Sequence, residues 1–184
     1  MLDTCLNVLL TELDNYIQAK TGTEAKIIYA HPEEPTNTTK DQIIMSLVDI
    51  VKEESGGDVK SYIPQGNGFV AKSSPVNLSL YILFSASFSP KNAFEGLKYL
   101  SLVVAFFQHK NYFDATNTPL LKQSALDKLS VSWVDLDQQA KSELWKRMGV
   151  HYIPSVLYRV GTIPIEDADD IGIKIPGIND IAIH

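Results

Sequence analysis

The chain has 184 residues, of which 45% are hydrophobic and 21% are charged, and its formal net charge is −6. These values are ordinary for one globular domain, and they argue against wholesale disorder and against a nucleic-acid partner, because a phosphate-binding face is normally basic. The single cysteine, Cys5, excludes a disulfide framework and a pair of thiolate metal ligands, which favours a reducing compartment.

The first predicted element is an amphipathic helix over residues 2–20. Its apolar residues recur three or four positions apart, namely Leu2, Leu6, Leu9, Leu13 and either Tyr16 or Ile17. Cys5 lies on or near the apolar side of this helix, so we interpret it as a packing residue. The start of the chain lacks the basic segment of a signal peptide, and no run of 18 apolar residues is present. We therefore expect neither a signal peptide nor membrane insertion.

Three strands and a long connection are predicted next. Residues 25–31 have strand composition, and residues 42–54 are rich in β-branched side chains, which favours a second strand. Residues 55–74 carry four of the ten glycines and form a long connection, for which a protruding hairpin is one interpretation. Residues 75–88 alternate at first and then become uniformly apolar, as a strand covered on both faces does.

A second helix is predicted over residues 90–108. Ser89 is a suitable N-cap, and Pro90 suits the first helical turn. One apolar stripe is formed by Phe94, Leu97, Leu100 or Ser101, Val104 and Phe107, and it is widened by Leu102, Val103 and Phe106. We expect this helix to be buried on more than one side, with the protein's own sheet as one cover and another subunit as a candidate for the second.

The remaining core elements follow in the order loop, strand, helix and strand. Residues 111–121 are interpreted as a loop. Residues 126–136 form a strand with Leu129, Val131 and Trp133 on one face. Asp135 or Asp137 caps the helix that ends at Gly149, and the last core strand follows, with Val156, Tyr158 and Val160 on one side.

Together these elements predict one mixed α/β (α+β) domain over residues 1–163. It contains a central sheet, mostly antiparallel or mixed, packed with about three helices. Residues 164–184 are predicted to form a separate C-terminal arm.

The arm is acidic and rich in isoleucine. It holds five acidic residues and one lysine, a net charge of −4 out of −6. Disordered tails are poor in β-branched residues, and Ile171, Ile173 and Ile175 alternate as in a strand that is added to an exposed sheet edge. Prolines at 164 and 176 are expected to separate this strand from the preceding one. Two interpretations of the arm carry equal weight at this point: it folds back onto its own domain, or it binds to a neighbouring subunit or to sheath. The candidate interface residues are Ile165, Ile171, Ile173, Ile175, Ile178, Ile181 and Ile183.

No motif in the chain predicts chemistry. The histidines are scattered singly at His31, His109, His151 and His184, without the spacing of a metal site. The glycines of residues 65–69 lack a nucleotide-binding frame, and the acidic run at 166–170 lacks the alternation of a Ca²⁺ loop. We therefore predict no catalytic residue, no cofactor and no metal. A deep pocket that gathers two or more of the histidines with carboxylates would favour an enzyme or a ligand-binding domain instead.

Four stretches carry a resemblance to a known family. They are "LNVLLTELDNYI", "LSLYILFSASFSPKNAFEGLKYLSLVVAFFQHKNYF", "NTP" at 117–119 and "YIPSVLYRV". In this order they resemble the tail-terminator (cap) family of phage-tail-like contractile injection systems, of the antifeeding-prophage and virulence-cassette kind. The resemblance covers most of residues 1–163 and excludes residues 53–74 and the arm.

The resemblance implies a structural function. Such a terminator is expected to form a hexameric ring that ends and closes the distal end of the sheath and inner tube, whose proteins are its partners. It would be present in the bacterial cytoplasm during assembly and afterwards in the particle. The alternatives are another structural component of the same kind of particle, such as a baseplate or tube-adaptor protein, and a small cytosolic enzyme or ligand-binding domain.

Overall fold

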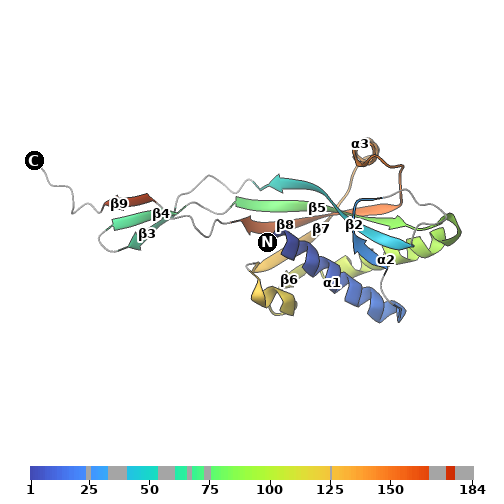
Figure 1. Ribbon diagram of the computed structural model, residues 1–184, viewed down its shortest axis with the longest axis horizontal. Coiled ribbons are helices and arrows are strands. Elements are labelled where there is room, and N and C mark those ends of the chain that lie inside the picture. The colour runs from blue at the N-terminus through green and yellow to red at the C-terminus, as the bar shows by residue number, and fades with distance from the viewer. Residues whose placement is uncertain are drawn as a thin grey trace, which may run out of the picture.

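The computed structural model describes residues 1–23, 26–32, 41–53, 61–65, 68–72, 76–124, 126–165 and 173–176. Its centre is a six-stranded sheet in the order β1-β2-β5-β8-β7-β6 (Figure 1). The strands are β1 (Ile27–Tyr29), β2 (Gln42–Lys52), β5 (Val76–Ser87), β8 (Ser155–Ile165), β7 (Lys128–Val134) and β6 (Tyr112–Asp114). Only β1 and β2 run parallel, and every other neighbouring pair of this sheet is antiparallel. The predicted mixed α/β fold is therefore confirmed.

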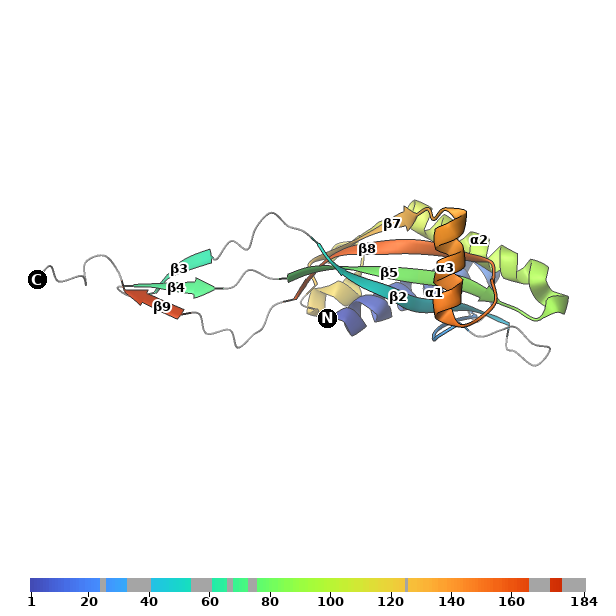
Figure 2. The same ribbon diagram turned by 90° about the horizontal axis from the view of Figure 1, so that it is seen from above.

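Three α-helices cover the two faces of this sheet. Helices α1 (Leu2–Thr21) and α2 (Ala93–His109) lie on one face, and α3 (Gln138–Met148) crosses the other (Figure 2). The larger hydrophobic core lies under α1 and α2 and includes Leu9, Leu13, Phe84, Val103 and Phe113. A smaller core under α3 is formed by Leu83, Leu144, Trp145, Ile153 and Leu157. Both faces of β5 are thus covered, as its uniformly apolar second half predicts.

The first helix forms where its pattern predicts. Its buried residues are Cys5, Val8, Leu9, Leu13 and Ile17, and it ends at Gly22, whose positive φ of 68° favours glycine. A salt bridge of 2.7 Å from Lys110 Nζ to Glu12 Oε2 joins the end of α2 to the middle of α1. None of the helices among the described residues is long and apolar enough to cross a membrane.

The second helix buries most of the predicted stripe but not its first residues. Leu100, Val103, Phe106 and Phe107 are buried as predicted, whereas Phe94 is 89% exposed and Leu97 is 45% exposed. The inward face begins at Gly96, where a Cβ would lie 2.9 Å from the ring of Phe88. This close approach of the Gly96 backbone to the Phe88 ring fixes the rotation of the helix. A stripe chosen by hydrophobicity alone does not include Gly96.

The prediction that the Ser89 side chain caps this helix is wrong, because the Asp41 carboxylate binds the start of the helix instead. Ser89 makes no side-chain capping bond and precedes a short 3-10 helix, Pro90–Asn92, before α2 begins. The Asp41 carboxylate, at the start of β2, accepts hydrogen bonds from the Ser89 N–H at 2.7 Å and from the Asn92 side-chain amide at 2.5 Å. These bonds lower the pKa of Asp41, with the Ser89 N–H as the largest cause.

Residues 111–121 are not simply a loop. They contain the edge strand β6, followed by a turn in which Asp114 Oδ1 accepts from the backbone N–H groups of Thr116 and Asn117, and the start of a second 3-10 helix, Pro119–Gln123. A three-residue strand is too short to show a period.

The predicted cap of α3 at Asp137 is confirmed, since the Asp137 carboxylate accepts from the Ala140 N–H at 2.8 Å. Helix α3 ends at Gly149 with a φ of 73°.

Candidate assembly interface

A second, three-stranded sheet stands apart from the six-stranded one, and we call it the distal sheet. It consists of β3 (Ser61–Gln65), β4 (Gly68–Lys72) and β9 (Ile173–Pro176), in that order and all antiparallel. Both views place it beyond the end of the six-stranded sheet along the long axis (Figures 1 and 2). The predicted hairpin in the long connection is therefore confirmed, and part of the predicted arm pairs with it in the same chain.

The pairing register of the distal sheet is continuous. β3 pairs with β4 from Ser61 opposite Lys72 to Gln65 opposite Gly68. β4 pairs with β9 from Gly68 opposite Pro176 to Ala71 opposite Ile173. The hairpin of residues 61–72 and the strand of the arm therefore form one small sheet.

The seven candidate isoleucines are only partly within the described residues. Ile173 and Ile175 lie in β9, paired with Ala71 and Phe69. Ile165 is the last residue of β8, where it pairs with Val76. Residues 171, 178, 181 and 183 lie outside the described part of the chain. The expectation that the proline at 164 separates the arm from the preceding strand is wrong, because β8 continues through it and pairs it with residue 77 of β5. Proline lacks a backbone N–H, but the strand is not interrupted here, because the residues before and after it, Ile163 and Ile165, also pair with β5.

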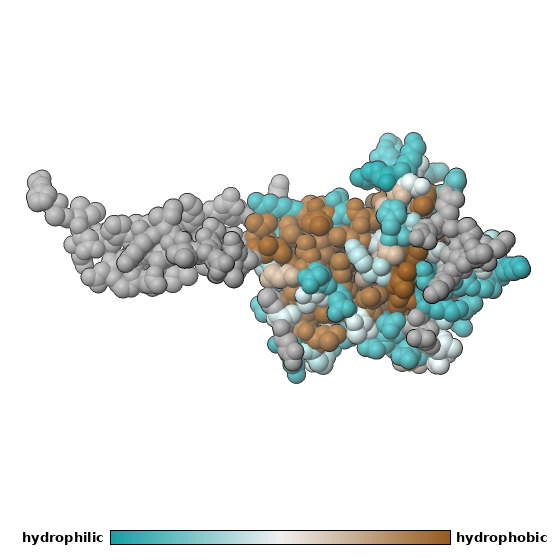
Figure 3. Space-filling view, viewed as in Figure 1, coloured by the Kyte–Doolittle hydropathy of each residue, from teal (hydrophilic) through white to brown (hydrophobic). Residues whose placement is uncertain are grey.

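A patch of apolar residues lies at the end of the six-stranded sheet that is nearest the distal sheet. Ile50 of β2 is 44% exposed and Val76 of β5 is 41% exposed. Ile165 pairs with Val76 and, like Leu2 and Leu6 at the start of α1, is only partly buried against the larger core. We call these five residues the basal patch. Figure 3 shows brown, hydrophobic surface at this end of the molecule, where α1 begins and β2 ends.

A polar cluster reinforces the three central strands at the same end. Arg159 of β8 donates from Nη2 to Glu53 Oε1 and from Nε to Ser79 Oγ, both at 3.0 Å, and the Ser79 hydroxyl donates to the same carboxylate oxygen. A Cβ on Gly161 would lie 2.7 Å from that oxygen, so only glycine leaves room for the cluster. This end of the six-stranded sheet is thus held by charge-assisted bonds.

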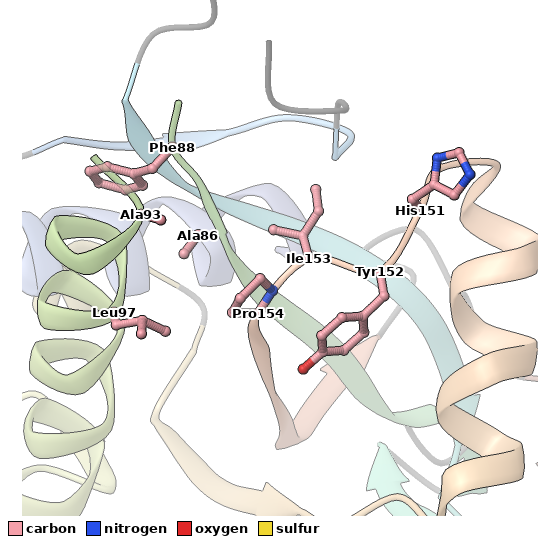
Figure 4. Close-up of a pocket in the computed structure, with 8 residues that line it drawn as sticks. All are labelled: Ala86, Phe88, Ala93, Leu97, His151, Tyr152, Ile153 and Pro154. Atoms are coloured by element: carbon pink, nitrogen blue, oxygen red, sulfur yellow. The ribbon is translucent and has the colours of Figure 1, made fainter. Parts of the chain in front are cut away.

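A hollow of about 280 Å³ opens at the opposite end of the six-stranded sheet (Figure 4). Six of its lining residues are apolar, and the other two are His151 and Tyr152. One imidazole and one phenol without a carboxylate do not form an acid–base pair, so this hollow does not meet the condition that would favour an enzyme. Leu97 stands on its rim, and Phe94 lies one turn before it on α2.

The other candidate chemical groups are dispersed. Cys5 is fully buried, and burial raises the pKa of its thiol to about 12, so it is not a nucleophile at neutral pH. His31 contacts the Pro32 carbonyl oxygen through Nδ1 at 3.0 Å, and His109 lies in the last turn of α2. Within the described ranges, no group of three or more His, Cys, Asp or Glu side chains could hold a metal ion.

Comparison with known proteins identifies the family of this chain. The family model described as the Pvc16 N-terminal domain matches residues 4–172, and the chain belongs to this family. No curated protein matches the sequence significantly.

The solved structures that share the fold include two terminators. One is the anti-feeding prophage cap, described as a tube terminating cap, with a TM-score of 0.61, 15% identity and coverage of 98% of this chain and 60% of that chain. The other is a PVC sheath/tube terminator of an extracellular contractile injection system in its extended state, with a TM-score of 0.57, 13% identity and coverage of 96% and 62%. The predicted resemblance to the terminator family is confirmed. The chain spans about three fifths of the length of either terminator.

Proposed function

We propose that this protein is a structural terminator that ends the sheath and inner tube of a contractile injection system. The observation that carries the proposal is the family membership over residues 4–172, together with a fold shared with two terminators of such particles. The exposed apolar surfaces support it, because a protein that closes a larger assembly needs broad contact surfaces and no active site.

The proposed working form is a hexameric ring of this chain, bound to sheath and inner-tube proteins. A closed ring uses heterologous contacts, in which each subunit offers one surface to a different surface of its neighbour. The basal patch is one exposed apolar surface that suits such a contact. The ring would assemble in the bacterial cytoplasm and remain in the particle, without cofactor, metal or catalysis.

We further propose the division of the chain into a body, residues 1–163, and an arm, residues 164–184. The join lies within β8, which ends at Ile165. The arm's role would be assembly, through the isoleucines at positions 165, 171, 173, 175, 178, 181 and 183.

Imaging of the intact particle by electron microscopy tests the proposal. We expect density for this chain at the distal end of the sheath and tube, with six-fold symmetry, and tubes of uncontrolled length when the chain is absent. A position beside the baseplate, or three- or twelve-fold symmetry in this layer, would contradict it. A monomer in dilute solution would not, because the tube can act as the template for the ring.

A further inference from the structure

We infer that the surface around the hollow of about 280 Å³ packs on the basal patch of a second copy of this chain. This surface, which we call the tip surface, consists of Phe94, Leu97, Trp133 and Tyr152. The inference rests on the proposed ring and names the two surfaces through which neighbouring subunits would touch.

The tip surface gathers the three most exposed large hydrophobic side chains of the described residues. Phe94 is 89% exposed, Tyr152 is 65% exposed and Trp133 is 52% exposed. Leu97, one turn after Phe94 on α2, and Tyr152 line the hollow from opposite sides (Figure 4). Tyr152 also lines a smaller hollow beside Trp133, so the four side chains surround one end of the six-stranded sheet. Aromatic side chains are enriched at the centres of protein–protein interfaces, and this gathering is typical of one.

The exposure of Phe94 is a consequence of how α2 is held. The approach of the Gly96 backbone to the Phe88 ring fixes the rotation of the helix. A salt bridge of 3.0 Å from Lys26 Nζ to Glu95 Oε1 joins the same turn to the residue before β1. The Phe94 ring therefore stays in water in the folded chain, and the free energy of burying it is available to binding.

Positive charge surrounds the hollow, although the whole chain is acidic. Lys91 and Lys98 lie one turn before and one turn after Phe94. Lys146 and Arg147 lie in the last turn of α3, and the loop that follows this helix lines the hollow. All four cations are exposed, and none of them forms an ion pair with another described residue. These charges favour a partner surface that is apolar with an acidic border.

The basal patch has that chemistry. Its side chains are all aliphatic, and Ile50 and Val76 are more than 40% exposed. The five residues that follow β8, residues 166–170, include four acids, against one lysine, Lys52, at the end of β2. Covalent geometry keeps the first two of these acids within about 7 Å of the end of β8, which belongs to the patch. The basal patch therefore complements the tip surface in both hydrophobicity and charge.

A second copy is the occupant because the two surfaces cannot meet within one chain. β5 begins at Val76, in the basal patch, and ends at Ser87, next to Ala86 of the hollow. Its 12 residues span about 37 Å, so the surfaces lie at opposite ends of the six-stranded sheet (Figures 1 and 2). Each copy carries one of each surface. A contact between unlike surfaces repeats from copy to copy and can close into a ring.

The size of the contact makes it dependent on assembly. An aromatic side chain can bury about 150–250 Å², so the exposed fractions of the three rings correspond to roughly 300–500 Å². That is below the roughly 800 Å² per partner of a standard pairwise interface. One contact is therefore weak between two free chains, whereas several contacts reinforce one another in a ring formed on a tube.

Disulfide trapping tests the contact even when it is weak. Cys5 is buried, so the described residues offer no competing exposed thiol. Chains carrying Leu97→Cys are mixed with mass-tagged chains carrying Ile50→Cys at several hundred micromolar under mild oxidation. The matched control is Gln108→Cys, which is exposed on the same side of α2 but about 16 Å further along the helix. We expect the heterodimer from Leu97→Cys at several-fold the yield from the control.

The other outcomes overturn the inference. Equal yields from Leu97→Cys and Gln108→Cys would remove the preference for the tip surface. Homodimers of Leu97→Cys in excess over heterodimers would mean that the tip packs on another tip. Trapping of Leu97→Cys only on a sheath or tube protein in intact particles would make another protein the occupant.

Exchange of charges tests the orientation of the contact. Lys91→Glu with Lys98→Glu, added to the Leu97→Cys chain, should lower the heterodimer yield several-fold. Glu166→Lys with Asp167→Lys in the Ile50→Cys chain should restore it, because the charges are then reversed on both sides. If the second pair of changes does not restore the yield, the acids that follow β8 do not face the tip and the inference is wrong.

Particles provide a test without oxidation. Phe94→Ser should reduce the fraction of capped particles several-fold and leave Tm unchanged, because the ring is exposed in the folded chain. The control Tyr112→Ser removes a 44% exposed ring of β6 outside both surfaces and should change capping little. Equal effects on capping would overturn the inference. Trapped heterodimers from a chain that lies beside the baseplate would support the contact and contradict the proposed function.

Discussion

Deletion of residues 166–184 should leave the body as stable as it is in the full chain. β9 pairs with β4 alone, so its loss removes no strand from the six-stranded sheet. Deletion of residues 164–184 also removes residues 164 and 165, which are the last two residues of β8 in that sheet. Ile165 is partly buried against the core and pairs with Val76. Loss of about half of an isoleucine's burial costs about 1 kcal/mol, and the lost ladder pairs bring the total to about 1–2 kcal/mol.

The two truncations can therefore be separated by thermal unfolding. For a chain of this size 1 kcal/mol corresponds to about 2–4 °C in Tm, so the longer deletion should lower Tm by roughly 3–6 °C and the shorter one by less than about 1 °C. Leu13→Ala, at a fully buried position, gives the scale of a core defect, with an expected cost of about 2–5 kcal/mol. Circular dichroism melts measure all three. If deletion of 166–184 lowers Tm as much as Leu13→Ala does, the arm is part of the body's core and the proposed division of the chain is wrong.

Three further predictions concern the body. Gly96→Ala should destabilise it by about 1–2 kcal/mol in urea unfolding, because the clash with the Phe88 ring outweighs the helix propensity gained, and an unchanged midpoint would refute this. The lowered pKa of Asp41 stabilises the folded state above the ordinary carboxyl pKa of about 4, and this is lost as the pH falls through the lower folded pKa. The urea midpoint of the wild type should therefore fall between pH 5 and pH 3, and Asp41→Asn should make this fall smaller. If the fall is the same in both proteins, the Ser89 N–H bond does not lower the pKa of Asp41. Cys5 should react with a thiol reagent at neutral pH only as fast as the chain unfolds, and rapid labelling of the native protein would contradict its burial.

The elements that could be predicted from the sequence are those whose period is local. The leucine spacing of α1, the uniformly apolar half of β5 and the Asp137 cap of α3 each depend on residues within a few positions of one another. Their pattern therefore fixes the element without knowledge of the fold.

The predictions that were wrong concern features that depend on residues distant in the sequence. The rotation of α2 depends on Phe88 packing against the backbone of Gly96, and the start of the helix depends on Asp41, which lies 48 residues before Ser89. Hydrophobicity alone places Phe94 in the core because it is large and apolar, yet it is the most exposed of the large hydrophobic residues in the described chain. The later part of the predicted stripe, with Val103 and Phe107, is buried, and tertiary contacts leave only its first large residues exposed.

The pairing of the arm with the hairpin could not be predicted from the sequence for the same reason. Residues 61–72 contain apolar residues at both odd and even positions, including Ile63 and Val70, so neither strand has an amphipathic pattern by itself. The register that pairs Phe69 with Ile175 depends on a contact between distant parts of the chain. The isoleucine spacing at 171–175 did predict a strand, but not that its pairing partner is a hairpin a hundred residues earlier.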